Sequence, residues 1–162
     1  MKNILVFCLL LCIAGSISAL ELSVGAGAEM NAYSREGIAA GGGLVCTMEL
    51  NEQFDVGLKT GFFHDFNELG ALEIQGLFRY QLPLGIRGLF TQAELGTVIL
   101  FYKEESYGAF LGALAAGWRL NPASEKWYIE PVIRIGYPFI WGLGVTAGIP
   151  LSFPSNKTNG GE

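Results

Sequence analysis

Eight segments of the chain alternate, with a period of two, between apolar residues and small or charged ones. In the first segment the even positions from Leu20 to Met30 are apolar or alanine, whereas Glu21 and Glu29 occupy odd positions. Successive side chains of a β-strand face opposite sides of a sheet, so this pattern predicts strands with one apolar face. No charged residue falls on the apolar face of any segment. The segments are 20–30, 38–50, 54–62, 72–82, 89–101, 110–120, 127–137 and 143–153.

The length of these segments favours strands that cross a membrane. Most of them have 11–13 residues, whereas an ordinary strand has about 5–6 and a tilted strand needs about 9–11 to cross a bilayer. Only 15% of the chain is charged although 51% is hydrophobic, which indicates a surface that does not face water everywhere. The connections are short and turn-rich, so they predict an up-and-down meander of hairpins.

The two ends of the chain differ from this pattern. Residues 1–19 resemble a secretory signal peptide, with Lys2 before a short apolar run and small residues before a cut after Ala19. The mature chain then keeps only Cys46, so it can form no internal disulfide and no cysteine metal cluster. We expect a single barrel domain over residues 20–153 and a disordered polar tail over 154–162.

The apolar face must point either at lipid or into the interior of a soluble barrel. The opposite face is rich in glycine and alanine, as the narrow interior of an eight-stranded barrel requires. Aromatic residues lie near the predicted strand ends, where the two bilayer–water interfaces favour them. This predicted aromatic girdle consists of Phe62, Tyr80, Phe101, Phe110, Trp118, Trp127, Tyr137, Trp141 and Phe153. A soluble periplasmic, lipocalin-like ligand-binding barrel is the alternative, with its apolar face inside.

The eight segments together resemble the small outer-membrane barrels of the OmpA, OmpX/opacity and OmpW type. The last segment, which ends at Phe153, is similar to the C-terminal strand that the insertion machinery of that family reads. The resemblance implies an all-β fold: a closed, eight-stranded, antiparallel, up-and-down transmembrane β-barrel. It further implies a bacterial outer-membrane location, lipid and the insertion machinery as partners, and a monomer. This chain departs from the family because residues follow Phe153, and because Pro131 and Pro150 are expected to weaken strand pairing or to mark bulges.

Charged and amide side chains on the inner face are the best candidates for a functional site. Counting along the hairpins places Arg119 opposite Glu130, Arg79 near Gln92, and Lys59 near Glu73. Two interpretations stay open: the network rearranges to pass ions or small solutes, or it is a static polar core. The predicted lumen network comprises Lys59, Glu73, Arg79, Gln92, Glu94, Arg119, Glu130 and Arg134.

Other functions find little support in the sequence. A net charge of −5 argues against nucleic acid as a partner. His64, with Asp65 and the distant Ser106, suggests a lipid-modifying barrel enzyme only as a minor alternative. A metal site at His64, Asp65 and Glu68 is equally weakly supported. We therefore expect no catalytic activity and no cofactor, and either a structural or surface role or narrow, gated permeation.

Overall fold

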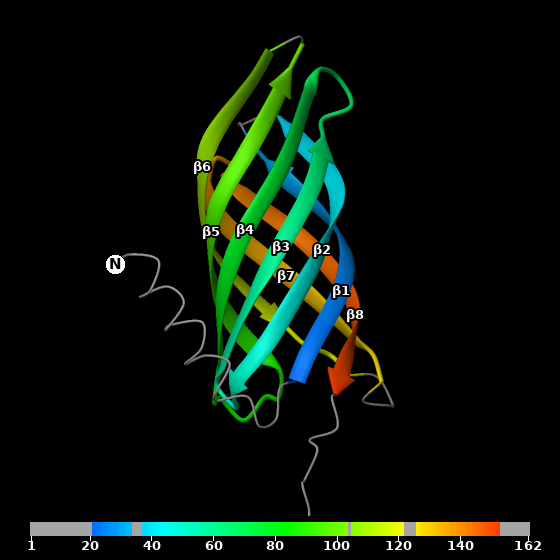
Figure 1. The fold of residues 1–162 in the computed structure, drawn as a ribbon, viewed down its shortest axis with the longest axis vertical. Helices are drawn as coiled ribbons and strands as arrows, with labels where there is room; N and C mark the ends of the chain where they lie inside the picture. The colour runs from blue at the N-terminus through cyan, green and yellow to red at the C-terminus, as the bar shows by residue number, and fades with distance from the viewer. Residues whose placement is uncertain (1–20, 34–36, 104, 122–125, 153–162) are drawn as a thin grey trace, which may run out of the picture.

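The eight strands close into one antiparallel barrel (Figure 1) in which each strand pairs with its sequence neighbours and β1 pairs with β8. The computed structural model describes residues 21–33, 37–103, 105–121 and 126–152. The predicted fold is thereby confirmed, whereas the predicted signal peptide, the tail and Phe153 lie outside the described residues. The strands are β1 (Glu21–Ala32), β2 (Ile38–Asn51), β3 (Phe54–His64), β4 (Leu69–Gln81), β5 (Leu89–Tyr102), β6 (Glu105–Trp118), β7 (Tyr128–Tyr137) and β8 (Trp141–Ser152).

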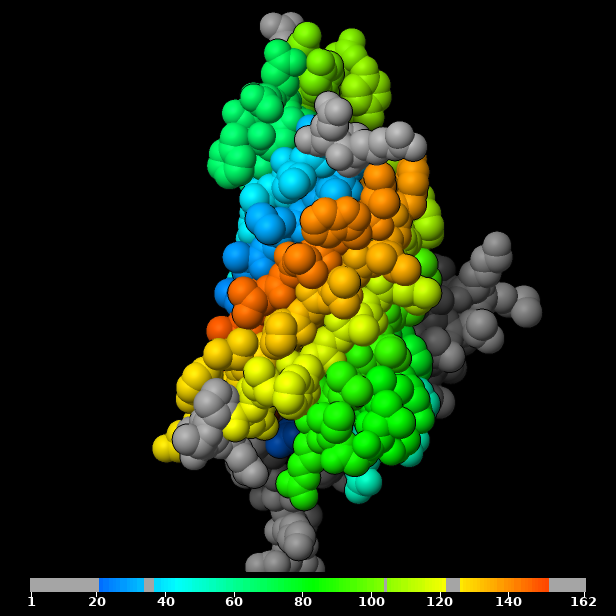
Figure 2. Space-filling model, turned by 180° about the vertical axis from the view of Figure 1, so that it is seen from behind, coloured from blue at the N-terminus to red at the C-terminus, as the bar shows by residue number. Residues whose placement is uncertain are grey.

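The barrel has two unlike ends. At the lower end in Figure 1, β1 begins beside the end of β8, where Glu21 pairs with Ser152. Strands β1, β3, β5 and β7 end at the upper end, and the β5–β6 hairpin rises highest. The strands run obliquely to the long axis (Figure 2), as closure of a barrel requires.

The β5–β6 hairpin is longer than the sequence pattern predicts. The alternating segments end at residue 101 and begin again at residue 110, but Tyr102 pairs with Glu105 and the ladder continues downward from there. The pairing of β6 with β7 starts only at Gly112, so the hairpin extends beyond its neighbour. Polar residues such as Glu105 and Ser106 break the apolar pattern without ending the strand, because side chains above a bilayer are solvated.

The two strand prolines mark no bulge, but strand pairing is weakened at Pro131, which is the other of the two expected effects. Pro131 pairs with Val145 and Pro150 pairs with Ser23 in continuous registers. On its other side Pro131 interrupts the pairing of β6 with β7, which stops at Val132 and returns as a single bridge between Leu120 and Ile129. Pro150 lies past the end of the β7–β8 ladder, which stops at Gly148. Proline is tolerated where only one neighbouring strand needs hydrogen bonds.

The apolar face points outward along the whole barrel. Leu58 and Leu95 are 67% and 63% exposed, whereas Glu94 and Arg134 inside are 1% and 3% exposed. An apolar exterior of this extent is stable in hydrocarbon but not in water. The lipocalin-like alternative is therefore wrong. In the part of the chain that the structure describes, there is no helix with the length and hydropathy to cross a membrane.

An apolar layer fills the upper part of the interior. Phe63, Val98 and Leu111 point inward there, at positions that the sequence pattern assigned to a polar or small-residue face. Phe139 joins them from the β7–β8 connection, and its ring centroid lies 5.8 Å from that of Phe63. The sequence analysis predicted an interior rich in glycine and alanine but did not predict this apolar layer, because alternation fixes which side a residue faces but not how the interior is filled.

Candidate functional site

Below the apolar layer, Arg134 of β7 binds carboxylates from three other strands. Its Nη2 lies 3.0 Å from Glu73 Oε2, its Nε lies 3.1 Å from Glu29 Oε1, and its Nη1 lies 3.4 Å from Glu94 Oε2. Lys59 of β3 adds a second cation, with its Nζ 2.6 Å from Glu29 Oε2. We call these five residues the upper cluster; it has three acidic and two basic side chains.

A second cluster lies nearer the lower end. Arg79 of β4 donates two parallel hydrogen bonds to Glu130 of β7, at 2.9 and 3.0 Å. Arg119 donates a further hydrogen bond to the same carboxylate at 2.6 Å, and Asp55 lies 4.0 Å from Arg79. We call Asp55, Arg79, Arg119 and Glu130 the lower cluster; its two cations balance its two carboxylates.

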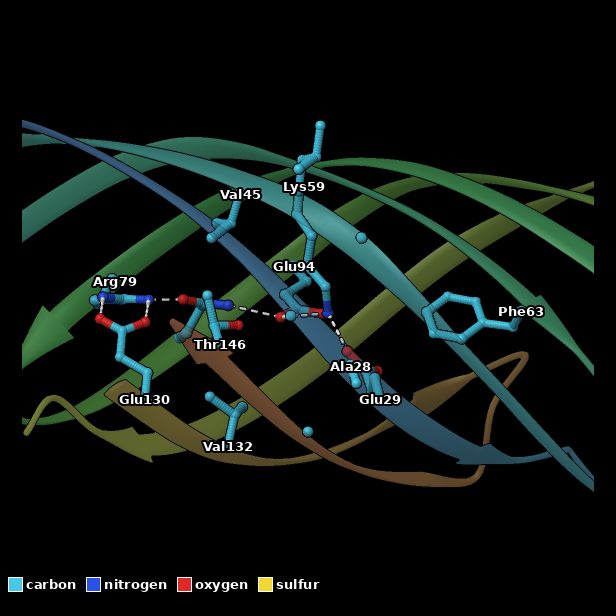
Figure 3. Close-up of a pocket in the computed structure, with 15 residues that line it drawn as sticks. Ala28, Glu29, Val45, Lys59, Phe63, Arg79, Glu94, Glu130, Val132 and Thr146 are labelled. Carbon is cyan, nitrogen blue, oxygen red and sulfur yellow. Dashed lines mark hydrogen bonds and ion pairs between the residues drawn. The ribbon is translucent and has the colours of Figure 1, made fainter. Parts of the chain in front are cut away.

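One side chain joins the two clusters. Gln92 accepts a hydrogen bond from Arg79 Nε at 3.1 Å and donates one to Glu94 at 2.6 Å. Beside this link lies a cavity of about 40 Å³, lined by members of both clusters. Figure 3 shows the Arg79–Glu130 pair on one side of this cavity and Lys59 reaching Glu29 on the other. The cavity can hold a few water molecules, since one needs about 10–15 Å³.

Glycines make the room that these long side chains need. A Cβ at Gly142 would clash with Asn31 Oδ1 and lie 3.1 Å from Cγ of Arg134. A Cβ at Gly117 would meet the ring of Phe90 at 2.5 Å, and this ring lies 3.8 Å beneath the Arg79 guanidinium. Small residues on the inner face therefore set the positions of both central arginines.

The structure brings all eight residues of the predicted lumen network together. The pairs obtained by counting along the hairpins, Arg79 with Gln92 and Arg119 with Glu130, are in hydrogen-bond contact. Sequence reasoning missed Glu29 and Asp55 as members, although both fall on the inner face of the alternating pattern. It also missed that Glu130 binds Arg79, because that contact crosses the barrel between strands that are not neighbours. Whether the network has a functional role stays a prediction.

The two ends of this interior differ in how they are filled. Above the upper cluster, Phe139 lies 5.4 Å from the guanidinium carbon of Arg134 and is 2% exposed, so the apolar layer directly covers the network. Below the lower cluster is a cavity of about 260 Å³ at the mouth of the barrel, lined by residues that include Glu49, Asp55 and Arg119. Glu49 and Asp55 lie opposite each other in the β2–β3 register. Water in this mouth would hydrate two opposed carboxylates.

The residues of the predicted aromatic girdle lie mainly on the exterior. Phe62, Phe110 and Tyr137 are 51%, 64% and 62% exposed. A second group is less exposed, between 38% and 42%, and consists of Phe101, Trp118, Trp127 and Trp141. Tyr80 is only half-buried and packs on Phe54, with ring centroids 5.1 Å apart. Their contact with the bilayer interfaces stays a prediction.

His64 is not arranged for catalysis. Its Nδ1 accepts a hydrogen bond from the Phe66 backbone N–H at 2.7 Å. Ser106 lies on the β5–β6 hairpin, paired with Phe101, and among the described residues no hydrogen bond links it to His64. Within the same residues no three histidine, cysteine or acidic side chains are placed to hold a metal ion, so the site suggested at His64, Asp65 and Glu68 is not formed.

Comparison with known proteins identifies the fold. No protein-family model and no curated protein matches the sequence. Neisserial surface protein A superposes with a TM-score of 0.58 at 8% identity, over 83% of this chain and 97% of that one. The N-terminal β-barrel domain of Pseudomonas aeruginosa OprF gives 0.52 at 14% identity, over 81% and 97%. Ail of Yersinia pestis gives 0.51 at 13% identity, over 83% and 99%.

These similarities agree with the structure's own features. The chain has the fold of the small, eight-stranded outer-membrane β-barrels. The apolar outward face of its strands and its closed sheet are what a barrel in a bacterial outer membrane requires, because lipid tolerates neither exposed charge nor an open strand edge. At these identities the comparisons define the fold and not a specific activity.

Proposed function

We propose that this outer-membrane barrel is closed to solutes and serves a structural or surface role through its exterior and its exposed ends. One observation carries the proposal: the interior is blocked twice in succession, by the joined ion-pair clusters and by the apolar layer around Phe63 and Phe139. The 40 Å³ cavity between the two clusters has room for water but is too small to let a hydrated ion pass. Buried charges with several partners each are held in place, since breaking such a pair leaves an uncompensated charge.

Conductance measurements test this proposal directly. The purified barrel is reconstituted into a planar phospholipid bilayer, and its fold is checked by the mobility shift that closed barrels show on unboiled gels. We expect no stepwise current from the wild-type protein over the voltages that the bilayer withstands. Long-lived open steps at neutral pH would show that the interior is a pore and would overturn the proposal.

Gated permeation is the second candidate, and the cavity favours it. Among the described residues, Gln92 is the only side chain that hydrogen-bonds to both clusters, and it lies beside a space that can hold water. A change of partners there would need little movement. Arg134→Ala removes the cation that holds three carboxylates and should produce brief current steps if the network is the gate. Arg134→Lys is the matched control, because it keeps the charge. An unchanged trace for Arg134→Ala counts against gating by the network.

The proposal also covers how the barrel is assembled and its oligomeric state. We infer that the C-terminal strand is the segment that the barrel-insertion machinery reads, and that the barrel acts as a monomer. Every strand already has two neighbours in the closed sheet, so a second copy is not needed to complete it. Deleting residues 153–162 should slow assembly in outer-membrane vesicles, whereas deleting only 154–162 should not.

We expect His64→Ala to leave every assayed function unchanged, because His64 belongs to no catalytic group.

A further inference from the structure

The β3–β4 connection exposes a phenylalanine that packs on little of its own chain. Phe66 is 79% exposed, the largest exposed fraction among the large hydrophobic residues of the described chain. Its nearest aromatic neighbour is His64, with ring centroids 6.1 Å apart. The φ angle of Phe66 is +64°, in a region that bulky side chains rarely occupy. A strained backbone that displays an unpacked apolar ring points to a contact outside the protein.

A set of hydrogen bonds fixes the backbone around Phe66. Asp65 Oδ1 accepts from the N–H groups of Asn67 and Leu69, at 2.8 and 3.0 Å. Asp65 Oδ2 accepts from the Tyr33 hydroxyl at 2.9 Å, which ties this connection to the end of β1. The hydrogen bond from the Asn67 N–H is the main reason why the pKa of the Asp65 carboxyl lies below its ordinary value. The ring of Phe66 is therefore presented by an ordered turn.

The position of this turn along the barrel places Phe66 at a bilayer surface. β3 has 11 residues, which is about the length that a tilted strand needs to cross a bilayer. The turn that follows it therefore begins where the hydrocarbon ends. The tip of the β5–β6 hairpin rises above this turn in Figure 1, so it extends farther into water.

The ring also continues the outward-facing side of the barrel. Phe62 and His64 alternate with the buried Phe63, so they share the outer face of β3. A Cβ at Gly70 would lie 3.7 Å from both Phe62 and Phe101, which shows that these two exterior rings come together next to the turn. In Figure 2 the teal-to-green segment that contains this turn overhangs the side of the molecule near the upper end.

We propose that Phe66 inserts into the headgroup–acyl boundary of the bilayer at the upper end and anchors the barrel at that depth. The site is a continuation of the lipid-contacting exterior, and phenylalanine is among the apolar residues that interfacial segments bury at this boundary. The ion pair between Glu68 and Lys103, at 3.6 Å, lies next to the turn and is exposed, as expected of groups on the water side of that boundary. A preordered turn loses little entropy when the ring inserts.

Site-specific fluorescence tests the depth of residue 66. In a Cys46→Ala background, Phe66→Cys is labelled with an environment-sensitive nitrobenzoxadiazole probe and reconstituted into phosphatidylcholine vesicles. A second set of vesicles contains phosphatidylcholine brominated near the top of its acyl chains. Lys103→Cys is the matched control for an exposed residue at the same end, and Phe62→Cys is the reference for a position of the predicted aromatic girdle. Each labelled barrel is checked for closure by its gel mobility.

We expect the probe at position 66 to show blue-shifted emission and loss of fluorescence with brominated lipid, as at position 62 and unlike at position 103. Water-like emission with no quenching would show that the ring faces solvent. Blue-shifted emission without quenching would show that protein covers the ring. Either result would overturn the proposal, while the closed interior, tested by conductance, would be unaffected.

Discussion

At the scale of single residues, the stability of the interior depends on whether each buried charge has a partner of opposite charge. Arg134 binds three carboxylates and is 3% exposed. Removing a cation from such a site costs far more than removing one from the surface, because the remaining carboxylates are left without compensation in a medium of low dielectric. The exposed pair of Lys103 with Glu68 has side chains that are 60% and 53% exposed, so water and salt screen it.

We predict that Arg134→Met lowers the free energy of unfolding by about 3–5 kcal/mol, whereas Lys103→Met lowers it by about 0–1 kcal/mol. The double variant Arg134→Met/Glu73→Gln should recover part of the loss, because it also removes one stranded carboxylate. Equilibrium unfolding of the barrel in vesicles with urea measures all three. Equal losses for Arg134→Met and Lys103→Met would show that the upper cluster is solvated in the native barrel.

The hydrogen bond between Tyr33 and Asp65 predicts a pH window for order in the β3–β4 turn. The pKa of Asp65 lies below its ordinary value, mainly because of the Asn67 N–H. The pKa of Tyr33 lies above its ordinary value, mainly because its hydroxyl donates to Asp65. The stabilisation from Asp65 is present above the ordinary carboxyl pKa and is lost as pH falls through the lowered one. The stabilisation from Tyr33 is present below the ordinary phenol pKa and is lost as pH rises through the raised one.

Amide chemical shifts of Asn67 and Leu69 in lipid nanodiscs report on this window. We expect these shifts to stay constant across it and to move at both its acid and alkaline limits. In Asp65→Asn the acid limit should disappear, because the amide does not titrate. Shifts that change near neutral pH would contradict the assignment.

At the scale of elements, strand length and the bilayer together decide where charge is tolerated. Leu58 lies at the middle of β3, faces outward and is 67% exposed. Tyr107 is 52% exposed on the part of β6 that extends past β7. The two positions look alike in exposure, but we expect only the first to lie within the hydrocarbon.

We predict that Leu58→Arg costs about 2–4 kcal/mol of folding free energy in vesicles, against about 0–1 kcal/mol for Tyr107→Arg. The physical reason is the depth dependence of charge burial in lipid. Urea unfolding in phosphatidylcholine vesicles compares the two, with Leu58→Ala as the control for lost apolar area. A similar cost at both positions would place the top of β6 inside the membrane.

At the scale of the whole molecule, closure of the interior depends on two layers of different chemistry. The ion-paired clusters are held by charge, whereas the upper layer around Phe63 and Phe139 is held by apolar packing. Opening one layer leaves the other in place, so a single substitution should not produce a steady pore.

We therefore predict that Arg134→Ala/Phe139→Ala conducts steadily in planar bilayers, while neither single variant does. Phe139 comes from the β7–β8 connection rather than from a strand, so its truncation should leave the sheet closed. Unboiled gel mobility checks that the double variant keeps its barrel. Steady conduction by Phe139→Ala alone would show that the clusters do not block ions.

The sequence by itself determined the strands, their number, their order and the side that each residue faces. Period-two alternation with charge on one side leaves few choices once the chain must satisfy every backbone group in lipid. It also determined contacts between hairpin neighbours, such as Arg79 with Gln92, because antiparallel register follows from the turn. Only the tertiary structure decided which residues meet across the lumen, such as Arg79 with Glu130, and that Phe139 folds inward above them. Contacts across a barrel depend on its stagger and on how side chains fill its interior, and neither quantity is periodic in the sequence.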